Sequence, residues 1–284
     1  MKIGDIKTFG VVGAGTMGLG IAQISAMAGY QTILFDINEQ MLSKAVQMIT
    51  KNLDKGIDRG KVTAEQKEAT LGRISTVNDL DKMIANVVVE AIVEKLEIKQ
   101  KVFATLERVN TKESILASNT SSIPITQIAA QLAHPERFVG MHFFNPAHIM
   151  KLVEVISGVS TDPEVANTIK ELASKLGKAP VMAKDAPGFI VNRVARHFYL
   201  EGLKLLEEGV ADVETIDQLM QTSGFKMGPF QLMDLIGVDT NFSVTTSMFD
   251  AFYKDSKFRP SRIQQQKVDA GHHGRKSGQG FYKY

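Results

Sequence analysis

The stretch from Lys7 to Gly20, KTFGVVGAGTMGLG, decides the fold class of this 284-residue chain. A strand-like apolar run ends in Gly13, Gly15 and Gly18, which form the pattern G-x-G-x-x-G, and a helical pattern begins at once and runs to Ala28. The glycine pattern alone is weak, because glycines occur at many strand–helix turns. Its position between a buried strand and a helix makes it typical of a dinucleotide-binding turn.

Each glycine of this turn has a physical role in such a site. The first permits a tight turn, the second lets a pyrophosphate approach the backbone, and the third lets helix and strand pack closely. The helix N-terminus then directs its N–H groups at the phosphates. The predicted cofactor-binding residues of this segment are Gly13, Gly15, Thr16, Met17 and Gly18.

Asp36 ends the second strand-like segment, YQTILFD, 23 positions after Gly13. A carboxylate there accepts hydrogen bonds from the ribose hydroxyls of an adenosine and repels a ribose 2′-phosphate. No arginine occurs between Asp36 and Arg59, so we predict NAD as the cofactor, and Lys44 keeps NADP open as an alternative. The other interpretation is a plain turn followed by a helix-capping aspartate.

Strand-like and helix-like segments alternate through the first part of the chain, which predicts an α/β fold with a Rossmann-like, doubly wound parallel sheet. No element is predicted in the charged stretch near 61–80. The expected strands lie in KTFGVVGAG, YQTILFD, NVVVEAI, SILAS, RFVGMHFF, KLVEVI and APVMAK, and the expected helices at 16–28, 39–60, 94–108, after Pro124 and at 163–176.

From Pro187 onward only helical patterns occur, among them GFIVNRVARHFYLEGLKLLEEG, DVETIDQLMQTSG and GPFQLMDLIGVDTNFSVTTSMFDAFYKD. Pro187 and Gly188 mark the change. The sequence therefore predicts a nucleotide-binding domain over residues 1–184 and an all-helical domain over residues 185–284. Several apolar stripes in this helical domain exceed what one small domain can bury, so we predict a homodimer formed through it.

Composition excludes several kinds of function. The 33 basic and 31 acidic side chains are well mixed and give a net charge of +2, so no nucleic-acid partner or membrane surface is predicted. Because the chain has no cysteine, disulfides, thiolate zinc sites and cysteine nucleophiles are excluded, and no metal site is predicted. No signal-peptide pattern and no run near twenty apolar residues is present, so a cytoplasmic location is expected.

Two ionisable residues stand in strand-like segments that are otherwise very apolar. His142 lies in VGMHFF, and Glu154 follows twelve residues later in KLVEVI. Buried ionisable groups need partners, and these two lie within the length of one hairpin. Taken alone, they are either a structural pair or a base with the carboxylate that orients it.

Six motifs follow Asp36 in order: VVEAIVE, ASNTSS, HFFNPAHIMKLVEV, KDAPGFIVNR, MGPFQLMDLIGVD and GRKSGQGFYKY. Together they resemble the 3-hydroxyacyl-CoA dehydrogenase family over nearly the whole chain, and the short bacterial 3-hydroxybutyryl-CoA dehydrogenases in particular. The resemblance implies an oxidoreductase of fatty-acid or butyrate metabolism with a Rossmann-like domain and a helical domain that dimerises. It implies NAD as cofactor and an acyl-CoA as substrate.

The resemblance also implies catalytic roles. The histidine of H-F-F-N-P is the family's general base and the glutamate of K-L-V-E-V orients it, which correspond to His142 and Glu154 here. Oxidising a secondary alcohol requires the hydroxyl proton to leave as hydride moves, and histidine suits that proton transfer. Ser121 and Asn192 resemble the residues that hydrogen-bond the substrate oxygen at C3. The competing interpretations are a core pair, a serine-rich turn for Ser121 and a helix cap for Asn192.

Contacts with the cofactor and with CoA are implied at further positions. Asn119 is expected beside the nicotinamide ribose, and Glu94 and Lys99 near the nicotinamide end, with a solvated helix start as the alternative. Lys51 and Lys55 lie with Arg59 on one face of the long helix after the second strand, where the family has a CoA-contacting lysine. An ordinary solvated face explains that spacing equally well.

One position departs from the family pattern. His148 stands where a second proline is usual after H-F-F-N-P, which puts the preferred acyl length in doubt. It ranks below His142 as a base because no matching carboxylate is apparent.

The sequence thus predicts an enzyme that interconverts (3S)-3-hydroxybutyryl-CoA and acetoacetyl-CoA with NAD(H). Two alternatives stay open at this point. One is a dehydrogenase of the same build that acts on a free hydroxy acid, and the other is a non-catalytic NAD-binding structural relative.

Overall fold

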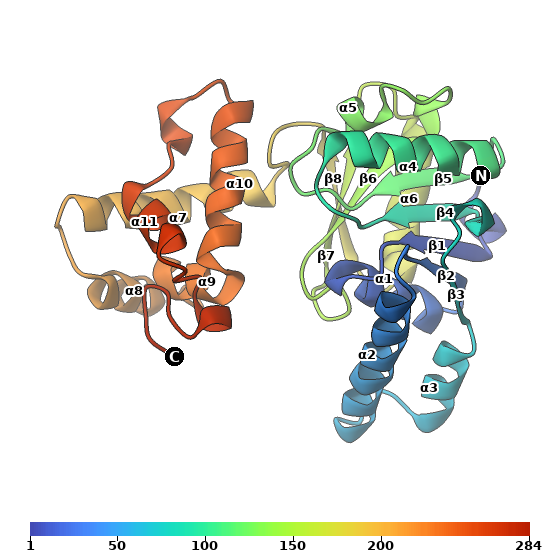
Figure 1. Cartoon of the computed structure of the whole chain (residues 1–284), viewed down its shortest axis with the longest axis horizontal. Coiled ribbons are helices and arrows are strands. Elements are labelled where there is room, and N and C mark those ends of the chain that lie inside the picture. Colours follow the sequence, from blue (N-terminus) through green and yellow to red (C-terminus); the bar gives the residue numbers. More distant parts are fainter. The chain divides into compact units, whose positions relative to one another are not determined.

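The computed structural model describes all residues, Met1–Tyr284, and they form two compact units, Met1–Ala186 and Pro187–Tyr284 (Figure 1). The first unit is an α/β domain and the second is all helical. The predicted fold class is confirmed.

The first unit is built on one eight-stranded sheet with the strand order β3-β2-β1-β4-β5-β6-β7-β8. All neighbouring strands are parallel except β6 and β7, which form an antiparallel pair. The strands are β1 (Thr8–Val12), β2 (Gln31–Phe35), β3 (Ile74–Val77), β4 (Val87–Glu90), β5 (Ile115–Ser118), β6 (Phe138–Phe143), β7 (Leu152–Ser157) and β8 (Ala179–Lys184).

Helices cover both faces of this sheet. The helices are α1 (Thr16–Met27), α2 (Glu39–Asp58), α3 (Ala64–Leu71), α4 (Leu96–Val109), α5 (Ile125–Ala129) and α6 (Pro163–Lys175). Residues of α1, α2 and α6 share one core cluster with alternate strand residues such as Val89, Ala117 and Met141. On the other face, Phe103 of α4 packs edge-on against Phe138 of β6, and Figure 1 shows α4 lying across the sheet. The strands β4, β5 and β6 are buried on both faces, which explains their continuous apolar runs.

The structure differs from the sequence prediction at three places in the chain. The charged stretch near 61–80 contains α3, which a capping box at Thr63 begins, and the edge strand β3, whose ISTV sequence is too polar and too short to show a pattern. Helix α4 begins at Leu96, so Glu94 lies in the turn before it. The last long helical pattern is two helices, because Gly237 adopts a φ of 107° between them.

The second unit consists of five α-helices around its own core: α7 (Val191–Glu207), α8 (Val213–Thr222), α9 (Pro229–Ile236), α10 (Val238–Ala251) and α11 (Arg262–Asp269). Two buried carboxylates organise it. Asp217 accepts the N–H groups of Phe230 and Gln231 at the start of α9, and Asp234 accepts those of Phe281 and Tyr282 in the C-terminal segment. Through Asp234, the motif MGPFQLMDLIGVD holds the C-terminal motif GRKSGQGFYKY in the same domain. No helix in the protein is both long and apolar enough to cross a bilayer.

Candidate active site

The glycine turn after β1 has the shape that a dinucleotide requires. Gly13 has a φ of 104°, and a Cβ built there would lie 2.6 Å from the carbonyl oxygen of Ala91. A Cβ on Gly18 would lie 1.7 Å from the carbonyl oxygen of Gly13, so only glycine allows this approach of helix to strand. A Cβ on Gly15 would meet nothing within 4 Å, and no side chain caps the start of α1. The turn is therefore tightly packed against the protein at Gly13 and Gly18. At Gly15 it leaves open space, where backbone N–H groups can donate hydrogen bonds to a phosphate.

Asp36 lies directly after β2, beside this turn. Its Oδ2 accepts the N–H of Ala14 at 2.9 Å, and its Oδ1 accepts the N–H of Asn38 at 3.0 Å. These bonds fix the carboxylate while both oxygens keep capacity for further donors, such as ribose hydroxyls. The glycine turn and Asp36 thus fit NAD as a cofactor: the start of α1 would receive its pyrophosphate, and Asp36 would accept from its adenosine ribose.

His142 and Glu154 are direct cross-strand partners of the antiparallel pair β6–β7. The imidazole Nδ1 lies 2.8 Å from the carboxylate Oε2, and the two residues are 6% and 1% exposed. Both alternate with strand residues of the core cluster under α1, α2 and α6, so both side chains point to the opposite face of the sheet. The ring of Phe144 lies 4.5 Å from the imidazole, centroid to centroid. The structure thus brings the predicted base and its predicted partner into contact.

The serine-rich segment after β5 is held by a carboxylate from a neighbouring turn. Oε1 of Glu94 accepts the N–H of Ser121 at 3.0 Å, and it also accepts the hydroxyl of Thr120 and the hydroxyl and N–H of Ser122. Asn119, at the start of the segment, accepts the N–H of Phe143 at 2.8 Å and so ties the end of β5 to the strand of His142. Ser121 is therefore set in a loop with a fixed backbone.

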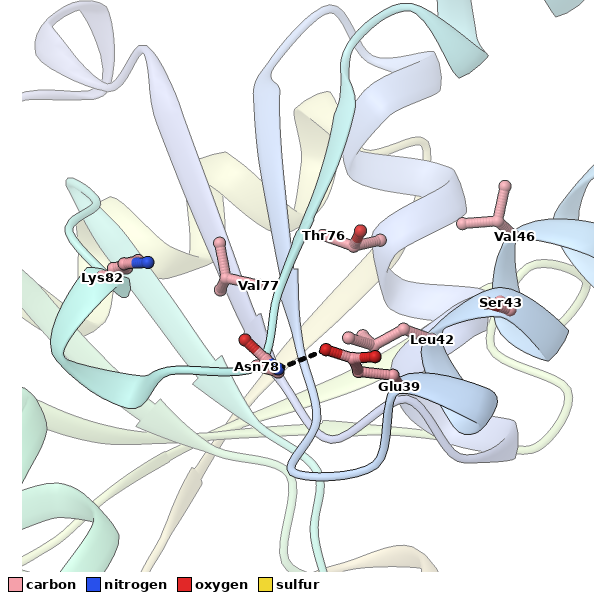
Figure 2. Close-up of a pocket in the computed structure, with 8 residues that line it drawn as sticks. All are labelled: Glu39, Leu42, Ser43, Val46, Thr76, Val77, Asn78 and Lys82. Atoms are coloured by element: carbon pink, nitrogen blue, oxygen red, sulfur yellow. Dashed lines mark hydrogen bonds between the residues drawn. The ribbon is translucent and has the colours of Figure 1, made fainter.

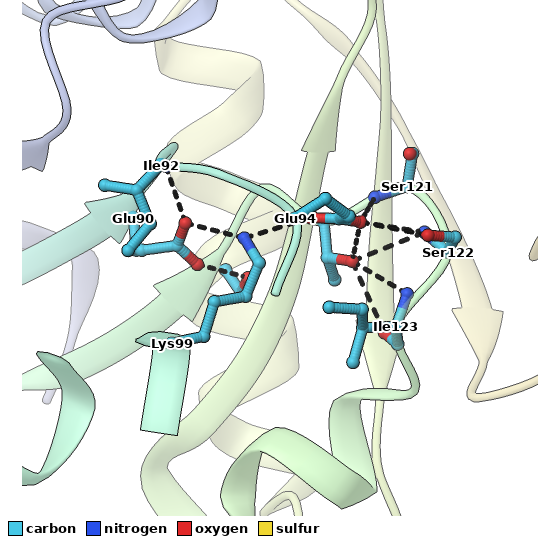
Figure 3. A network of polar contacts seen from close by, with 9 residues as sticks. Glu90, Ile92, Glu94, Lys99, Ser121, Ser122 and Ile123 are labelled. Carbon is cyan, nitrogen blue, oxygen red and sulfur yellow. Dashed lines mark hydrogen bonds and ion pairs between the residues drawn. The ribbon is translucent and has the colours of Figure 1, made fainter. Parts of the chain in front are cut away.

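Beneath this loop lies a polar network in the interior, shown in Figure 3. The ammonium of Lys99 lies 2.7 Å from Oε1 of Glu90 and 3.1 Å from Oε2 of Glu94. Burial would raise the pKa of Glu94, but Lys99, the Thr120 hydroxyl and the N–H of Ser121 outweigh it and hold the pKa below its ordinary value. Lys99 is only 1% exposed, so the alternative of a solvated helix start does not describe its position.

Several residues that shape this site were not predicted from the sequence. Glu90 and Ser118 belong to the buried network, and Asp185 accepts the N–H groups of Ile125 and Thr126 at the start of α5. The available signal was a carboxylate at the end of an all-apolar strand, VVVE, which needs a buried partner. Asp185 stands in KDAPGF, where the sequence pattern indicates only the change of domain.

The two units match one protein family along almost their whole length. Residues 8–186 match the NAD-binding domain of 3-hydroxyacyl-CoA dehydrogenase, and residues 188–284 match the C-terminal domain of the same enzyme. The chain belongs to the 3-hydroxyacyl-CoA dehydrogenase family. The predicted family, the enzyme class and the NAD-binding domain are thereby confirmed.

Individual proteins that are similar to this dehydrogenase over most of its length are dehydrogenases of hydroxyacyl-CoA compounds as well. It is 48% identical over 282 residues to the 3-hydroxyadipyl-CoA dehydrogenase of Escherichia coli K12, across 99% of this chain and 59% of that protein. It is 44% identical to a probable 3-hydroxybutyryl-CoA dehydrogenase of Deinococcus radiodurans, across 97% of this chain and 99% of that one. The crystal structure of (S)-3-hydroxybutyryl-CoA dehydrogenase from Ralstonia eutropha superposes with a TM-score of 0.95 at 39% identity, covering 99% of both chains. This dehydrogenase therefore spans about three fifths of the first relative and nearly all of the second.

Three other predicted site residues of the dehydrogenase lie on helices. Asn192 belongs to the helical unit, in the first turn of α7, whose N-cap is Ile190, so Asn192 is not that helix's cap. Lys51 and Lys55 lie exposed on α2, one turn apart, and Arg59 is the C-cap residue of that helix.

A hollow of about 500 Å³ lies between the first turns of α2 and the end of β3 (Figure 2). Glu39 and Asn78 face each other across it and share a hydrogen bond of 2.6 Å. None of the predicted catalytic residues lines it, so this hollow is not the place where His142 and Glu154 lie.

His148 lies half-buried in the loop after β6. Burial and the nearby Lys178 ammonium lower its pKa below the ordinary histidine value. Lys178 itself donates to the carbonyl groups of Ala147 and Met150 and so holds this loop. No carboxylate forms an ion pair with His148, which favours His142 as the base.

Proposed function

We propose that this dehydrogenase interconverts (3S)-3-hydroxybutyryl-CoA, or a similar short-chain 3-hydroxyacyl-CoA, and the corresponding 3-oxoacyl-CoA. The observation that carries the proposal is the buried contact of 2.8 Å between His142 Nδ1 and Glu154 Oε2, in a chain of this family. A buried histidine–carboxylate pair at a strand end is the arrangement that proton transfer at a secondary alcohol requires.

His142 and Glu154 divide the proton chemistry between them. Glu154 holds the proton on Nδ1, so exchange with the substrate hydroxyl takes place at Nε2. In oxidation, the C3 hydroxyl gives its proton to Nε2 and the C3 hydrogen leaves as hydride. When bound, NAD supplies the hydride acceptor. The imidazolium that forms is stabilised by the adjacent carboxylate, and in the reductive direction it returns the proton to the C3 oxygen.

Ser121 and Asn192 are the proposed donors to the C3 oxygen. A neutral hydroxyl and a neutral amide can polarise a carbonyl without competing for the proton that His142 carries. The loop of Ser121 is fixed through its own N–H, which donates to Glu94, so its backbone does not need to reorganise when substrate binds.

The exposed basic face of α2 is the proposed contact for the phosphates of CoA. Lys51 and Lys55 lie one turn apart in the last part of α2, and Arg59 is its C-cap residue, so three exposed positive charges follow at intervals of four residues. Lysine ammonium groups on flexible side chains suit the binding of phosphates at the protein surface.

The acyl group admits a second candidate, because one relative at 48% identity is a 3-hydroxyadipyl-CoA dehydrogenase, whose substrate ends in a carboxylate. An assay with acetoacetyl-CoA and 3-oxoadipyl-CoA, each with NADH and with NADPH, separates the candidates. We expect turnover of acetoacetyl-CoA with a preference for NADH. Turnover of 3-oxoadipyl-CoA alone would assign the longer diacid substrate, and turnover of free 3-oxo acids would contradict the CoA assignment.

A homodimer formed by the helical unit is part of the proposal. Large apolar side chains stay exposed on α8 and α9 and on the loop between them, namely Leu219, Phe225, Leu235 and Ile236. A second copy that covers these side chains with twofold symmetry is the commonest solution to such exposure.

A further inference from the structure

Glu90 is buried at the end of β4, where an ionised group is costly. It is 0% exposed, and Lys99, whose ammonium faces it, is 1% exposed. Oε1 of Glu90 also accepts the N–H of Ile92 at 2.7 Å, and Oε2 accepts the hydroxyl of Ser118 at 2.7 Å. Both oxygens therefore have defined partners, and the carboxylate has one orientation.

The same ammonium links Glu90 to the loop of Ser121. Lys99 reaches Oε2 of Glu94 at 3.1 Å, while Oε1 of Glu94 receives the N–H groups of Ser121 and Ser122. Figure 3 shows the resulting row from Glu90 through Lys99 to Glu94 and on to the serines. The two carboxylate oxygens of Glu94 thus have different roles, because Lys99 holds one of them and the other holds the loop.

Stability alone does not explain this arrangement. A buried ion pair is usually matched or exceeded in stability by well-packed apolar residues, because removing two charges from water is expensive. Here two carboxylates share one ammonium, so the network has a net charge of −1 if all three groups are ionised. Such a network can instead serve to hold one carboxylate, here that of Glu94, in a fixed position.

The register of the sheet relates this network to the base. Glu90 pairs with Ser118 and Ser118 pairs with Gly140, and His142 follows two residues later on the same face. Strand spacing of about 4.8 Å and a rise of about 3.3 Å per residue put the Cα of His142 roughly 8 Å from that of Ser118. Glu90, Ser118 and His142 therefore stand on three consecutive strands, β4, β5 and β6, of one sheet.

We propose that Glu90, supported by Ser118, is a positioning residue of this dehydrogenase: it holds Lys99 beneath Glu94, so that Glu94 fixes the backbone of the substrate-binding Ser121. This inference rests on the proposed role of Ser121 in substrate binding. Glu90 itself does not touch the substrate; it acts through two other side chains.

The first test is Glu90→Gln, measured by amide hydrogen exchange over residues 119–123 in the full-length protein. Without the Glu90 charge, the Lys99 ammonium is held only by Glu94, so the two side chains can move together and Glu94 loses its fixed place. We expect the N–H groups of Ser121 and Ser122 to exchange at least about tenfold faster, since they lose bonds to a charged acceptor. Unchanged exchange would overturn the inference, whatever the enzyme's substrate proves to be.

The second test is turnover of acetoacetyl-CoA, for which small displacements near the reacting atoms matter. We expect Glu90→Gln to lower kcat by up to about 10²-fold with little change in the KM for NADH. The double variant Glu90→Gln/Lys99→Met removes both buried charges, so its thermal midpoint should recover while kcat stays low. Recovery of kcat together with stability would show that Glu90 has a structural role only.

The pH dependence supplies a third readout. The pKa of Glu94 is lowered with help from Lys99, so this carboxylate stays ionised below the ordinary glutamate range. In Lys99→Met that pKa rises, and the acid-side loss of kcat should begin at higher pH than in the wild type. An acid limb that does not move would contradict the path through Glu94.

Asp81→Asn is the matched control, because it removes a carboxylate from an exposed ion pair with Arg108 in the same domain. It should change neither the exchange of residues 119–123 nor kcat. Wild-type protein that is inactive on every 3-oxoacyl-CoA would overturn the proposed function, and the exchange experiment would still decide whether Glu90 positions the loop.

Discussion

Replacing Glu154 by glutamine should abolish most of the turnover while leaving the sheet intact. Glutamine keeps the size of the side chain and removes the charge that lies 2.8 Å from Nδ1 of His142. Two unit charges about 4 Å apart at an effective dielectric constant of 20 interact by about 4 kcal/mol. Because about 1.4 kcal/mol corresponds to tenfold in rate, losing this stabilisation of the imidazolium is worth up to about 10³-fold in kcat.

The substitution Glu154→Gln should also lower kcat by changing the tautomer of the His142 imidazole. The amide group of glutamine can donate to Nδ1, which would place the imidazole proton on Nε2 and prevent that nitrogen from accepting a proton from the substrate. Solvent reorganisation and side-chain movement recover part of the electrostatic loss, so we expect a fall of about 10²–10³-fold in kcat.

The assay is the change in NADH absorbance with acetoacetyl-CoA, together with the affinity for NADH and the thermal midpoint. Glu136→Gln is the matched control: Glu136 also lies against a histidine, His134, at 3.1 Å, but the two side chains are 53% and 35% exposed to solvent. Its loss should leave kcat unchanged within about twofold. If Glu154→Gln lowers the thermal midpoint and keeps full kcat, the pair is structural and the reasoning is wrong.

Three further predictions concern the cofactor, the CoA end and the assembly. Asp36→Ala should weaken NADH binding and narrow the gap to NADPH, since it removes the ribose acceptor and the charge opposing a 2′-phosphate; wild-type protein that prefers NADPH in steady-state assays would contradict the assignment. Lys51→Glu/Lys55→Glu should raise the KM for acetoacetyl-CoA at low salt and leave kcat and NADH affinity unaltered, whereas an unchanged KM would return these lysines to an ordinary solvated face. Light scattering should report about twice the 31.2 kDa chain mass, and a fully active monomer at micromolar concentration would exclude the dimer.

The sequence was most informative where a short residue pattern is compatible with only one local structure. The glycine turn could be predicted because Gly13 and Gly18 lie so close to other backbone atoms that a side chain does not fit. The pairing of His142 with Glu154 could be predicted because two ionisable residues in apolar strands twelve positions apart need a partner, and a hairpin supplies one.

The sequence was least informative where position depends on contacts between distant segments. Lys99 shares a face of α4 with the buried Phe103 and Leu106, but a lysine on such a face normally extends its ammonium to water. Here the carboxylates of Glu90 and Glu94 compensate for its burial, and the sequence does not reveal those contacts. The edge strand β3 carries the polar sequence ISTV and could not be predicted, because an edge strand that is half-exposed needs no apolar run. Asp185 acts on a helix start sixty residues earlier in the chain, which no spacing rule reveals.

The central claim is that His142 is the acid–base group of an NAD-dependent short-chain 3-hydroxyacyl-CoA dehydrogenase. The most direct measurement is the turnover of acetoacetyl-CoA with NADH by the wild type and by His142→Gln, with the binding of both ligands measured on the same samples. The account predicts ready turnover by the wild type, and for the variant nearly normal binding with a loss of about 10²–10⁴-fold in kcat. A variant that keeps more than about a tenth of wild-type kcat would contradict it, since general acid–base assistance is worth more than that.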